Sequence, residues 1–311
     1  MYLDVAGQPV SILALAGLGI VVGLIAGMFG VGGGFVLTPL LATVLGVPLP
    51  IAVGSGLCQM IGTATVSVLR HQRLGQGELR FDWLMLLPSI IGTAAGAKTV
   101  EALAGAGSVQ LFGKTMPLVV LVLYGAYALF LFGSGGALAK RANSKVEELG
   151  YVRRGPLARL AVPPYVDFPR VPLSRVSAIV VAYVGLGLGF LSGLLGVGGG
   201  IALMPALLFG FGFPLRQAAG TGIVVLLVTS ASGTVFHAYQ GNVHLGLSMV
   251  LAVGASLSAQ VGALLTAKLP PRFLRAGLSW LILGTLVTIA YDFAAQFWYL
   301  LLPCCPRTSP T

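Results

Sequence analysis

Two short glycine runs carry the backbone best suited to holding a ligand. The sequence Gly-Val-Gly-Gly-Gly occupies positions 30–34 and returns at positions 196–200. An apolar segment follows each run, beginning near Phe35 and Ile201. If these segments are helices, their first N–H groups have no partner and lie at the positive end of the helix dipole. Because glycine admits a ligand close to the backbone, each run predicts an anion cradle that needs no charged side chain.

The same glycines allow a simpler interpretation. Small residues let helices pack closely in membranes, and a glycine run can serve that purpose alone. The runs are duplicated and compact, and each precedes a short apolar segment, which favours ligand binding. On that hypothesis, valine at Gly33 or Gly199 abolishes transport of the ligand and leaves membrane insertion intact.

Polar side chains in the next apolar segment extend each predicted cradle. When the two copies are superimposed, Ser55 aligns with Thr221 and Thr63 aligns with Thr229. Gln59 adds an amide that can donate to an oxyanion. The alternative is that the hydroxyls bond to carbonyls of their own helix or bridge neighbouring helices.

Two histidines occupy equivalent positions at the ends of these segments, His71 and His237. They relay a proton if transport is proton-coupled, or they fix a loop at the membrane interface. The predicted binding set combines the glycine runs, the residue after each run and the polar side chains: Gly30, Gly32, Gly33, Gly34, Phe35, Ser55, Gln59, Thr63, Gly196, Gly198, Gly199, Gly200, Ile201, Thr221 and Thr229.

The glycine runs belong to a long internal repeat. Residues 23–77 and 189–243 align without a gap and share 19 identities in 55 positions. Both copies have a proline after the glycines, Pro39 and Pro205. A long-period repeat fixes the architecture of a chain, and a duplicated glycine break in apolar sequence is typical of a transporter's binding site.

Composition places these elements in a membrane. The mean hydropathy is +0.96 and only 8% of the residues are charged, against about 25% in soluble domains. No Asp, Glu, Lys or Arg occurs from Val5 to Leu69 or from Gln217 to Ala267, and about 20 apolar residues span a bilayer. The segments lack the short alternation of outer-membrane barrels. We therefore expect a multi-pass helical protein of the inner membrane, with the lipid bilayer as a partner.

The net charge of +10 does not indicate nucleic-acid binding, because eight of the 18 basic residues lie in one polar connector. Basic residues in cytoplasmic loops orient membrane proteins. Three cysteines without metal-ligand spacing predict no metal site, and we expect no cofactor. The run Gly185-Leu186-Gly187-Leu188-Gly189 lacks the strand and acidic residue of a dinucleotide site.

Four regions follow from the pattern: a first transmembrane repeat (1–132), a basic connector (133–175), a second repeat (176–302) and a tail (303–311). The connector is predicted to be a loop with a short helix near 137–149, and the first apolar run lacks the basic flank of a cleaved signal peptide. Apolar segments are predicted at 10–29, 35–49, 51–69, 83–104, 114–132, 176–195, 201–213, 215–236, 245–267 and 274–301.

The positive-inside rule decides how the repeats are oriented. With the connector in the cytoplasm, four crossings per repeat leave 12 basic residues inside and six outside. An odd number of crossings gives 15 inside and three outside (Lys98, Lys114 and Arg307). The odd count is favoured, so the repeats are predicted to be inverted, with both termini outside the cytoplasm.

The predicted fold is an all-α polytopic membrane protein with two inverted-topology repeats. Each repeat contains a broken or re-entrant helical hairpin at its glycine run and about three further transmembrane helices. The return leg 35–49 reaches only about 22 Å, less than the ~30 Å hydrocarbon core. The glycine tip is therefore expected at some depth within the protein, where irregular backbone lines a cavity or is packed.

These motifs resemble the TauE/SafE sulfite exporter family, also called the toluene-sulfonate uptake permeases. The resemblance rests on residues 27–34 with Pro39-Leu40-Leu41, on 193–200 with Pro205, on 52–55, on 219–221, on His71 and on 237–243. It implies secondary transport of a small anion, often sulfur-containing: sulfite, a sulfonate, sulfoacetate or a related organic acid. A passive anion-selective channel and a membrane scaffold or sensor are the alternatives, and no enzymatic activity is expected.

Overall fold

The computed structural model describes most of both predicted repeats. It covers residues 2–5, 8–30, 32–111, 114–118, 155–160, 162–171, 173–196, 198 and 200–270, with short helical pieces from 121 to 129 and from 273 to 287. The first repeat and its flanks contain β1 (Tyr2–Val5), β2 (Gln8–Ser11), α1 (Ile12–Phe29), α2 (Gly34–Thr43), α3 (Leu49–Arg73), α4 (Leu79–Gly105), β3 (Ser108–Leu111) and β4 (Lys114–Pro117).

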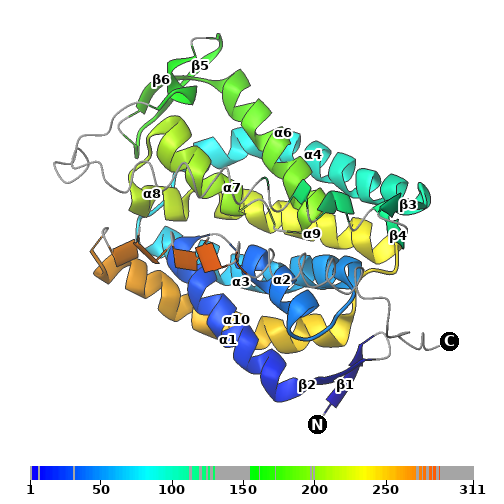
Figure 1. Ribbon diagram of the computed structural model, residues 1–311. Coiled ribbons are helices and arrows are strands. Elements are labelled where there is room, and N and C mark those ends of the chain that lie inside the picture. Colours follow the sequence, from blue (N-terminus) through cyan, green and yellow to red (C-terminus); the bar gives the residue numbers. More distant parts are fainter. Residues whose placement is uncertain are drawn as a thin grey trace.

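The connector and second repeat contain a matching series. It consists of the short 3-10 helix η2 (Leu157–Arg159), β5 (Tyr165–Phe168), β6 (Leu173–Ser177), α6 (Ala178–Leu195), α7 (Gly200–Pro205), the π-helical segment η3 (Ala206–Phe211), α8 (Leu215–Gly220), α9 (Ile223–Tyr239) and α10 (Leu245–Lys268). α1 begins beside β2 at the lower right of Figure 1, and α6 begins beside β6 at the upper left.

Six segments of the described chain are long and apolar enough to cross a bilayer, which confirms a mostly helical, multi-pass membrane protein. They are Ile12–Phe29, Leu49–Arg73, Leu79–Leu103, Ala178–Leu195, Gln217–Tyr239 and Leu245–Thr266. α2 is different, since its 10 residues rise only about 15 Å. It ends at Thr43, well before the predicted boundary at residue 49, because the chain turns through Gly46 at a φ of 67°.

Three antiparallel hairpins were not predicted: β1–β2, β3–β4 and β5–β6 (Figure 1). The last one corrects the prediction that the connector is a loop, while the helix predicted near 137–149 lies outside the described residues. The hairpin is anchored by aromatic packing. Phe168 of β5 packs edge-on against Phe81 of α4, with ring centroids 5.3 Å apart. Phe81 also contacts Phe211 and Phe213, so the hairpin is fixed to both repeats.

The predicted helix 215–236 is interrupted at Thr221 and Gly222, whereas its counterpart α3 runs unbroken. Gly222 has a φ of 84°, a left-handed conformation that favours glycine. The broken backbone is held by α4 and by the turn before it. The Asp82 carboxylate accepts a hydrogen bond from Gly222 N, and the Thr221 hydroxyl accepts one from Glu78 N at 3.0 Å.

Glycine stripes bring the repeats into backbone contact. α1 packs along α10, and α6 packs along α4. Every fourth residue of α1 and α6 is a glycine there, and a Cβ would overlap backbone of the opposite helix at each position: Gly19, Gly23 and Gly27 against Leu251, Ala255 and Ala259, and Gly185, Gly189 and Gly193 against Met85, Ser89 and Thr93. Such small-residue spacing allows close approach of membrane helices. Each repeat's first helix therefore packs on a helix of the other repeat.

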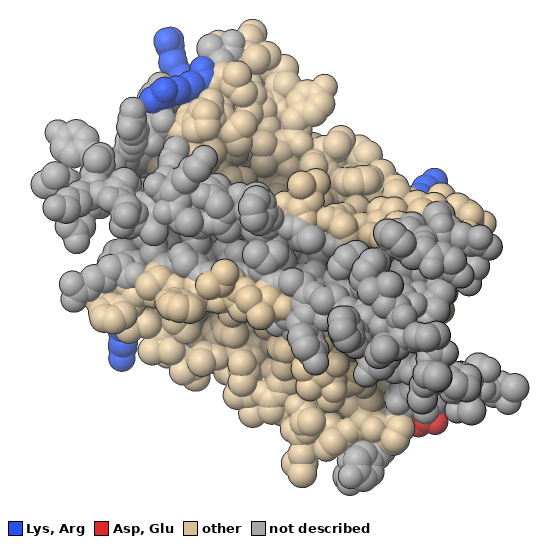
Figure 2. Space-filling view, viewed as in Figure 1, with Lys and Arg blue, Asp and Glu red and all other residues tan. Residues whose placement is uncertain are grey.

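The exterior matches a lipid-embedded surface. On the face shown in Figure 2 the described side chains are largely uncharged, and the charged ones lie at the margins. Large apolar side chains are exposed on several helices, including Leu13 of α1 (83%), Trp83 of α4 (70%) and Tyr183 of α6 (71%). Contiguous apolar surface of this kind is rare on soluble monomers and is expected where lipid is the solvent.

Candidate functional site

Left-handed glycines end α1 and α6 and begin two loops at the glycine runs. In the first glycine loop (30–33), Gly30 and Gly32 have φ values of 64° and 74°. In the second glycine loop (196–199), Gly196 and Gly198 have φ values of 67° and 66°. Non-glycine residues rarely adopt this region, so backbone conformation favours glycine at these four positions. The helices α2 and α7 begin immediately after the loops, at Gly34 and Gly200.

The two loops lie around one shared side chain, Met60 of α3. A Cβ placed on Gly32 would lie 3.0 Å from the Met60 sulfur, and one on Gly198 would lie 2.9 Å from it. A Cβ on Gly34 would lie 2.8 Å from the same sulfur and 3.0 Å from the carbonyl oxygen of Gly196. The structure therefore brings residues of both glycine runs to within about one side chain of each other.

Several buried polar groups of the helices that carry or follow the glycine loops have no hydrogen-bond partner among the described residues. Gln59 is fully buried, and neither its Nε2 nor its Oε1 is bonded. Ser230 Oγ is also buried and unbonded, and it lies 3.1 Å from the Cβ position of Gly198. Thr38 and Ser192 are unbonded as well. An unpaired buried polar group costs free energy, so a ligand or a water molecule that bonded to these atoms would stabilise them.

The predicted hydroxyls fall into two groups. Thr229 Oγ1 lies 3.2 Å from Gly198 O of the second glycine loop and 3.1 Å from Leu226 O of its own helix, so both interpretations describe it. Thr63 Oγ1 donates to Met60 O of its own helix at 3.1 Å, as the simpler interpretation expected. Ser55 accepts from His244 N at 2.9 Å, and Thr221 accepts from Glu78 N, so both hold segments distant in the chain. Hydroxyl spacing alone did not reveal these partners.

The two histidines make equivalent contacts. His71 Nε2 lies 3.2 Å from Gly27 O, and His237 Nε2 lies 3.2 Å from Gly193 O. A carbonyl oxygen only accepts, so each Nε2 carries a proton. Both rings are buried within the protein, 1% and 0% exposed. His71 therefore ties the end of α3 to the carbonyl three residues before the first glycine loop, and His237 ties the end of α9 to the carbonyl three residues before the second. The proton-relay role stays a prediction.

Other predicted residues are described only partly or not at all. Gly199 lies outside the described residues, and the side chains of Phe35 and Ile201 do as well. Sequence reasoning missed Met60, Thr38 and Ser192, and it left Ser230 out of the predicted binding set. Ser230 directly follows Thr229, which was an available signal, whereas Thr38 and Ser192 align with Met204 and Ala26 and so carry no repeat signature.

The central residues offer polarity without charge. The groups that meet at the glycine loops are backbone, the Ser230 hydroxyl, the Met60 thioether and the apolar Leu226 side chain, and the unbonded Gln59 amide is on the same helix as Met60. No cluster of three or more His, Cys, Asp or Glu side chains able to hold a metal occurs in the described part of the chain. Backbone N–H groups and hydroxyls can donate to an anion, and they do so without the strong attraction of a lysine or arginine.

Comparison with known proteins identifies the family. The model of the sulfite exporter TauE/SafE family matches residues 15–289. The chain belongs to the TauE/SafE family. Related proteins include the probable membrane transporter protein YunE of Bacillus subtilis, 26% identical over 270 residues that cover 83% of this chain and 90% of YunE. No solved structure matches the chain significantly.

Two further relatives of this TauE/SafE protein carry similar names. The probable membrane transporter protein YjnA of Bacillus subtilis is 28% identical over 275 residues, covering 86% of this chain and 94% of YjnA. The probable membrane transporter protein MJ0441 of Methanocaldococcus jannaschii is 24% identical, covering 84% and 89%. The sequence resemblance is thus confirmed over nearly the whole chain, and the protein is a membrane transporter of the TauE/SafE type.

Proposed function

We propose that this TauE/SafE protein is a secondary carrier for a small anion, bound between the two glycine loops. The observation that carries the proposal is the meeting of Gly34, Gly198 and the Gly196 carbonyl around Met60, beside the unbonded Ser230 hydroxyl; the unbonded Gln59 amide precedes Met60 on the same helix. The first backbone N–H groups of α2 have no partner within the helix, and they lie at the positive end of its dipole. An oxyanion would receive bonds from these amides, from the Gln59 amide and from hydroxyls.

The substrate class is a small sulfur-containing oxyanion: sulfite, a sulfonate, sulfoacetate or a related organic anion. The family description supports sulfur, and the uncharged donors support an anion that must leave again after each crossing. A site of lysines or arginines would retain the same anion more strongly. Met60 lies where the ligand would sit, and its flexible thioether side chain can change rotamer to admit it.

Equivalent contacts support inverted repeats and an alternating-access mechanism. The two repeats are offset by 166 residues, and the hydrogen bonds across them are equivalent under that offset. Ser55 aligns with Thr221 and Glu78 aligns with His244, so the Ser55–His244 bond and the Thr221–Glu78 bond are the same contact made from each repeat. The two histidine–carbonyl contacts and the two glycine stripes obey the same relation. In Figure 1, α1 and α6 begin at opposite ends of the molecule. Rocking of two such halves about a central site exposes the site alternately to each side of the membrane.

Charge distribution supports the inner membrane with the connector in the cytoplasm. The connector carries eight basic residues, and Arg170 within it bonds to the turn between α3 and α4 through its backbone N–H to Glu78 at 2.8 Å. Arg70, Arg73 and Arg80 flank that same turn. Positive charge gathers on cytoplasmic loops, so this end faces the cytoplasm and both chain termini face away from it.

Counterflow in proteoliposomes tests the proposal directly. Vesicles loaded with sulfite, thiosulfate, sulfoacetate or lactate are assayed for uptake of the labelled anion. A carrier is stimulated by substrate on the opposite side, whereas a channel gives equal flux with and without it. Stabilisation of the protein against heating by one of these anions identifies the substrate. Absence of both flux and stabilisation for all anions would leave a scaffold or sensor and defeat the proposal.

A matched pair of glycine variants separates site effects from backbone strain. Gly198 and Gly46 have φ values of 66° and 67°, but only Gly198 has neighbours near its Cβ position, Met60 and Ser230. We expect Gly198→Ala to lower flux by about tenfold or more, because the added methyl group overlaps Met60 and Ser230 and displaces the groups that would hold the anion. Gly46→Ala imposes the same strain in open space and should retain flux once expression is matched. Equal losses in both variants would contradict the cradle.

A further inference from the structure

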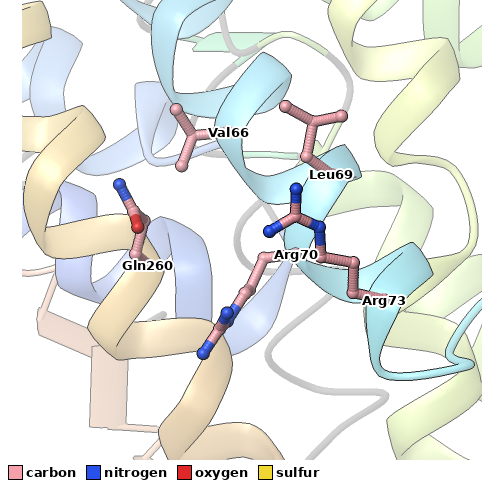
Figure 3. Close-up of a pocket in the computed structure, with 5 residues that line it drawn as sticks. All are labelled: Val66, Leu69, Arg70, Arg73 and Gln260. Atoms are coloured by element: carbon pink, nitrogen blue, oxygen red, sulfur yellow. The ribbon is translucent and has the colours of Figure 1, made fainter.

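A second polar site lies away from the glycine loops, between α3 and α10. A pocket of about 150 Å³ is lined by Val66, Leu69, Arg70 and Arg73 of α3 and by Gln260 of α10 (Figure 3). In Figure 3 the Arg70 and Arg73 side chains extend from α3 across the space toward α10. We call this group of five residues the arginine pocket.

The chemistry of the arginine pocket is that of an oxyanion receptor. Arg70 and Arg73 are three residues apart, so they lie on one face of the last turns of α3. None of the five lining residues is acidic. Arg70 Nε is buried and has no hydrogen-bond partner among the described residues, and the Gln260 amide can add a further donor. Two guanidinium groups beside one amide match the geometry of a phosphate.

The surroundings of the arginine pocket point to a lipid. Leu69 is 55% exposed on the outer face of α3, and Val66 lies one turn further from the charged end. Apolar side chains thus border the pocket toward the membrane centre, and arginines border it toward the helix end. A phospholipid has the matching arrangement, with its acyl chain toward the membrane centre and its headgroup phosphate toward the surface. Basic pockets between transmembrane helices at the cytoplasmic side suit such headgroups.

The two arginines have no counterpart in the second repeat. The positions equivalent to Arg70 and Arg73 are Phe236 and Tyr239 at the end of α9, so the other end of the molecule carries aromatic residues in place of the charges. Duplication therefore does not account for the arginines. Met60, which contacts the glycine loops, is fully buried, whereas Leu69 and Arg73 further along α3 are exposed.

We propose that the arginine pocket binds the headgroup phosphate of an anionic phospholipid. Arg70 and Arg73 donate to the phosphate oxygens, Gln260 adds a donor from α10, and the acyl chain runs beside Leu69 and Val66. The bound lipid joins the end of α3 to α10. Because α3 also carries Met60 and Gln59, the lipid braces the helix that supports the proposed anion site, but its binding does not require that the anion site exist.

The test uses the full chain in nanodiscs of phosphatidylcholine with or without phosphatidylglycerol, and it measures the melting temperature and co-purified lipid. We expect phosphatidylglycerol to raise the melting temperature of the wild-type protein and to remain bound after delipidation. Arg70→Gln with Arg73→Gln should lose at least half of that shift. Arg80→Gln is the matched control, because Arg80 is an exposed arginine near the same turn that does not line the pocket.

Three results would overturn the proposal. One is an equal melting temperature in the two lipid mixtures. Another is a shift reproduced by inorganic phosphate in pure phosphatidylcholine, which identifies a free-phosphate site only. The last is an equal loss in Arg80→Gln, which identifies general surface charge. If the double arginine variant does not fold, Gln260→Leu tests the same pocket from α10, and it should weaken retention of phosphatidylglycerol about threefold or more while leaving the fold intact.

Discussion

At the scale of single residues, Gln59 is the most informative side chain of the site. It is fully buried in α3, and neither amide atom is bonded within the described structure. A group in this condition lowers stability unless a ligand or water satisfies it. Stability therefore favours an apolar residue at this position, whereas the proposed anion binding favours the amide. Such a conflict is common where binding requires a strained or unsatisfied group.

Gln59→Leu separates those demands. Leucine is similar in volume and removes the unpaired amide, so the free energy of unfolding should stay level or rise by about 1 kcal/mol. Anion flux should fall by about tenfold or more, because an oxyanion loses one donor. Thr65→Val is the control on the same helix, since the exposed Thr65 hydroxyl bonds only to Ile61 O. Unchanged flux in Gln59→Leu would remove Gln59 from the site.

At the scale of elements, Asp82 of α4 holds the start of α9. Its Oδ1 accepts from Gly222 N, the residue that precedes the first turn of α9. An acceptor at this position satisfies one of the free N–H groups of a helix start. We expect Asp82→Ala to lower the free energy of unfolding by about 2 kcal/mol, and Asp82→Asn by less, because the amide oxygen still accepts.

Asp167→Ala is the matched control for the Asp82 variants. Asp167 also accepts a backbone N–H, from Arg175 at 2.6 Å, but in an exposed hairpin. Its loss should cost less than about 1 kcal/mol, since water replaces the bond. Urea or thermal unfolding in detergent measures both. A larger effect at Asp167 than at Asp82 would contradict the proposed support of α9.

The glycine stripe of α1 yields a second prediction for this scale. A Cβ on Gly23 would overlap the backbone of α10 at Ala255, whereas a Cβ on Gly17 meets nothing within 4 Å. Gly23→Ala should destabilise the protein by about 1–3 kcal/mol through overpacking. Gly17→Ala should be neutral or stabilising by up to about 1 kcal/mol, because alanine favours helix. Melting temperatures of the two variants test this, and equal values would count against close packing of α1 on α10.

Local sequence predicted the helices well and their interruptions poorly. The segment predicted at 10–29 is α1 at Ile12–Phe29, and the one at 245–267 is α10 at Leu245–Lys268. Long apolar runs determine such helices by themselves. The break at Gly222 was not predictable from the repeat. The aligned residue in the first repeat is also a glycine, Gly56, and it lies within the unbroken helix α3, so the residue type does not distinguish the two positions. Bonds from Asp82 and Glu78, distant in sequence, hold the broken form.

The candidate site shows the same division. The duplicated glycines were found because their left-handed backbone requires glycine, which leaves a mark in the sequence. Met60 was not found and Ser230 was left out of the predicted binding set, because only the fold shows which glycine loop each side chain approaches. Ser55 and Thr221 were placed on the anion path from their alignment, yet their bonds go to His244 and Glu78. Partners more than 140 residues away leave no periodic signal.

At the scale of the whole molecule, the proposed orientation is open to a labelling test. In a background without native cysteines, Pro9→Cys in β2 should react with an impermeant maleimide in intact cells, because both termini are proposed to face away from the cytoplasm. Arg159→Cys in the connector should react only after permeabilisation. Both positions are exposed in the structure, so accessibility to the reagent does not limit labelling. The reverse pattern would contradict the proposed topology.

The crossed packing of α1 on α10 and of α6 on α4 also bears on how the protein is made. α1 enters the membrane early in translation, but the helix that covers its glycine stripe is synthesised more than 200 residues later. Until then that stripe faces lipid or the insertion machinery. Neither half can complete its own packing, so neither should accumulate when expressed alone. Two halves divided in the connector and produced together should assemble, and assembly quality control would act only after the last helices emerge from the ribosome.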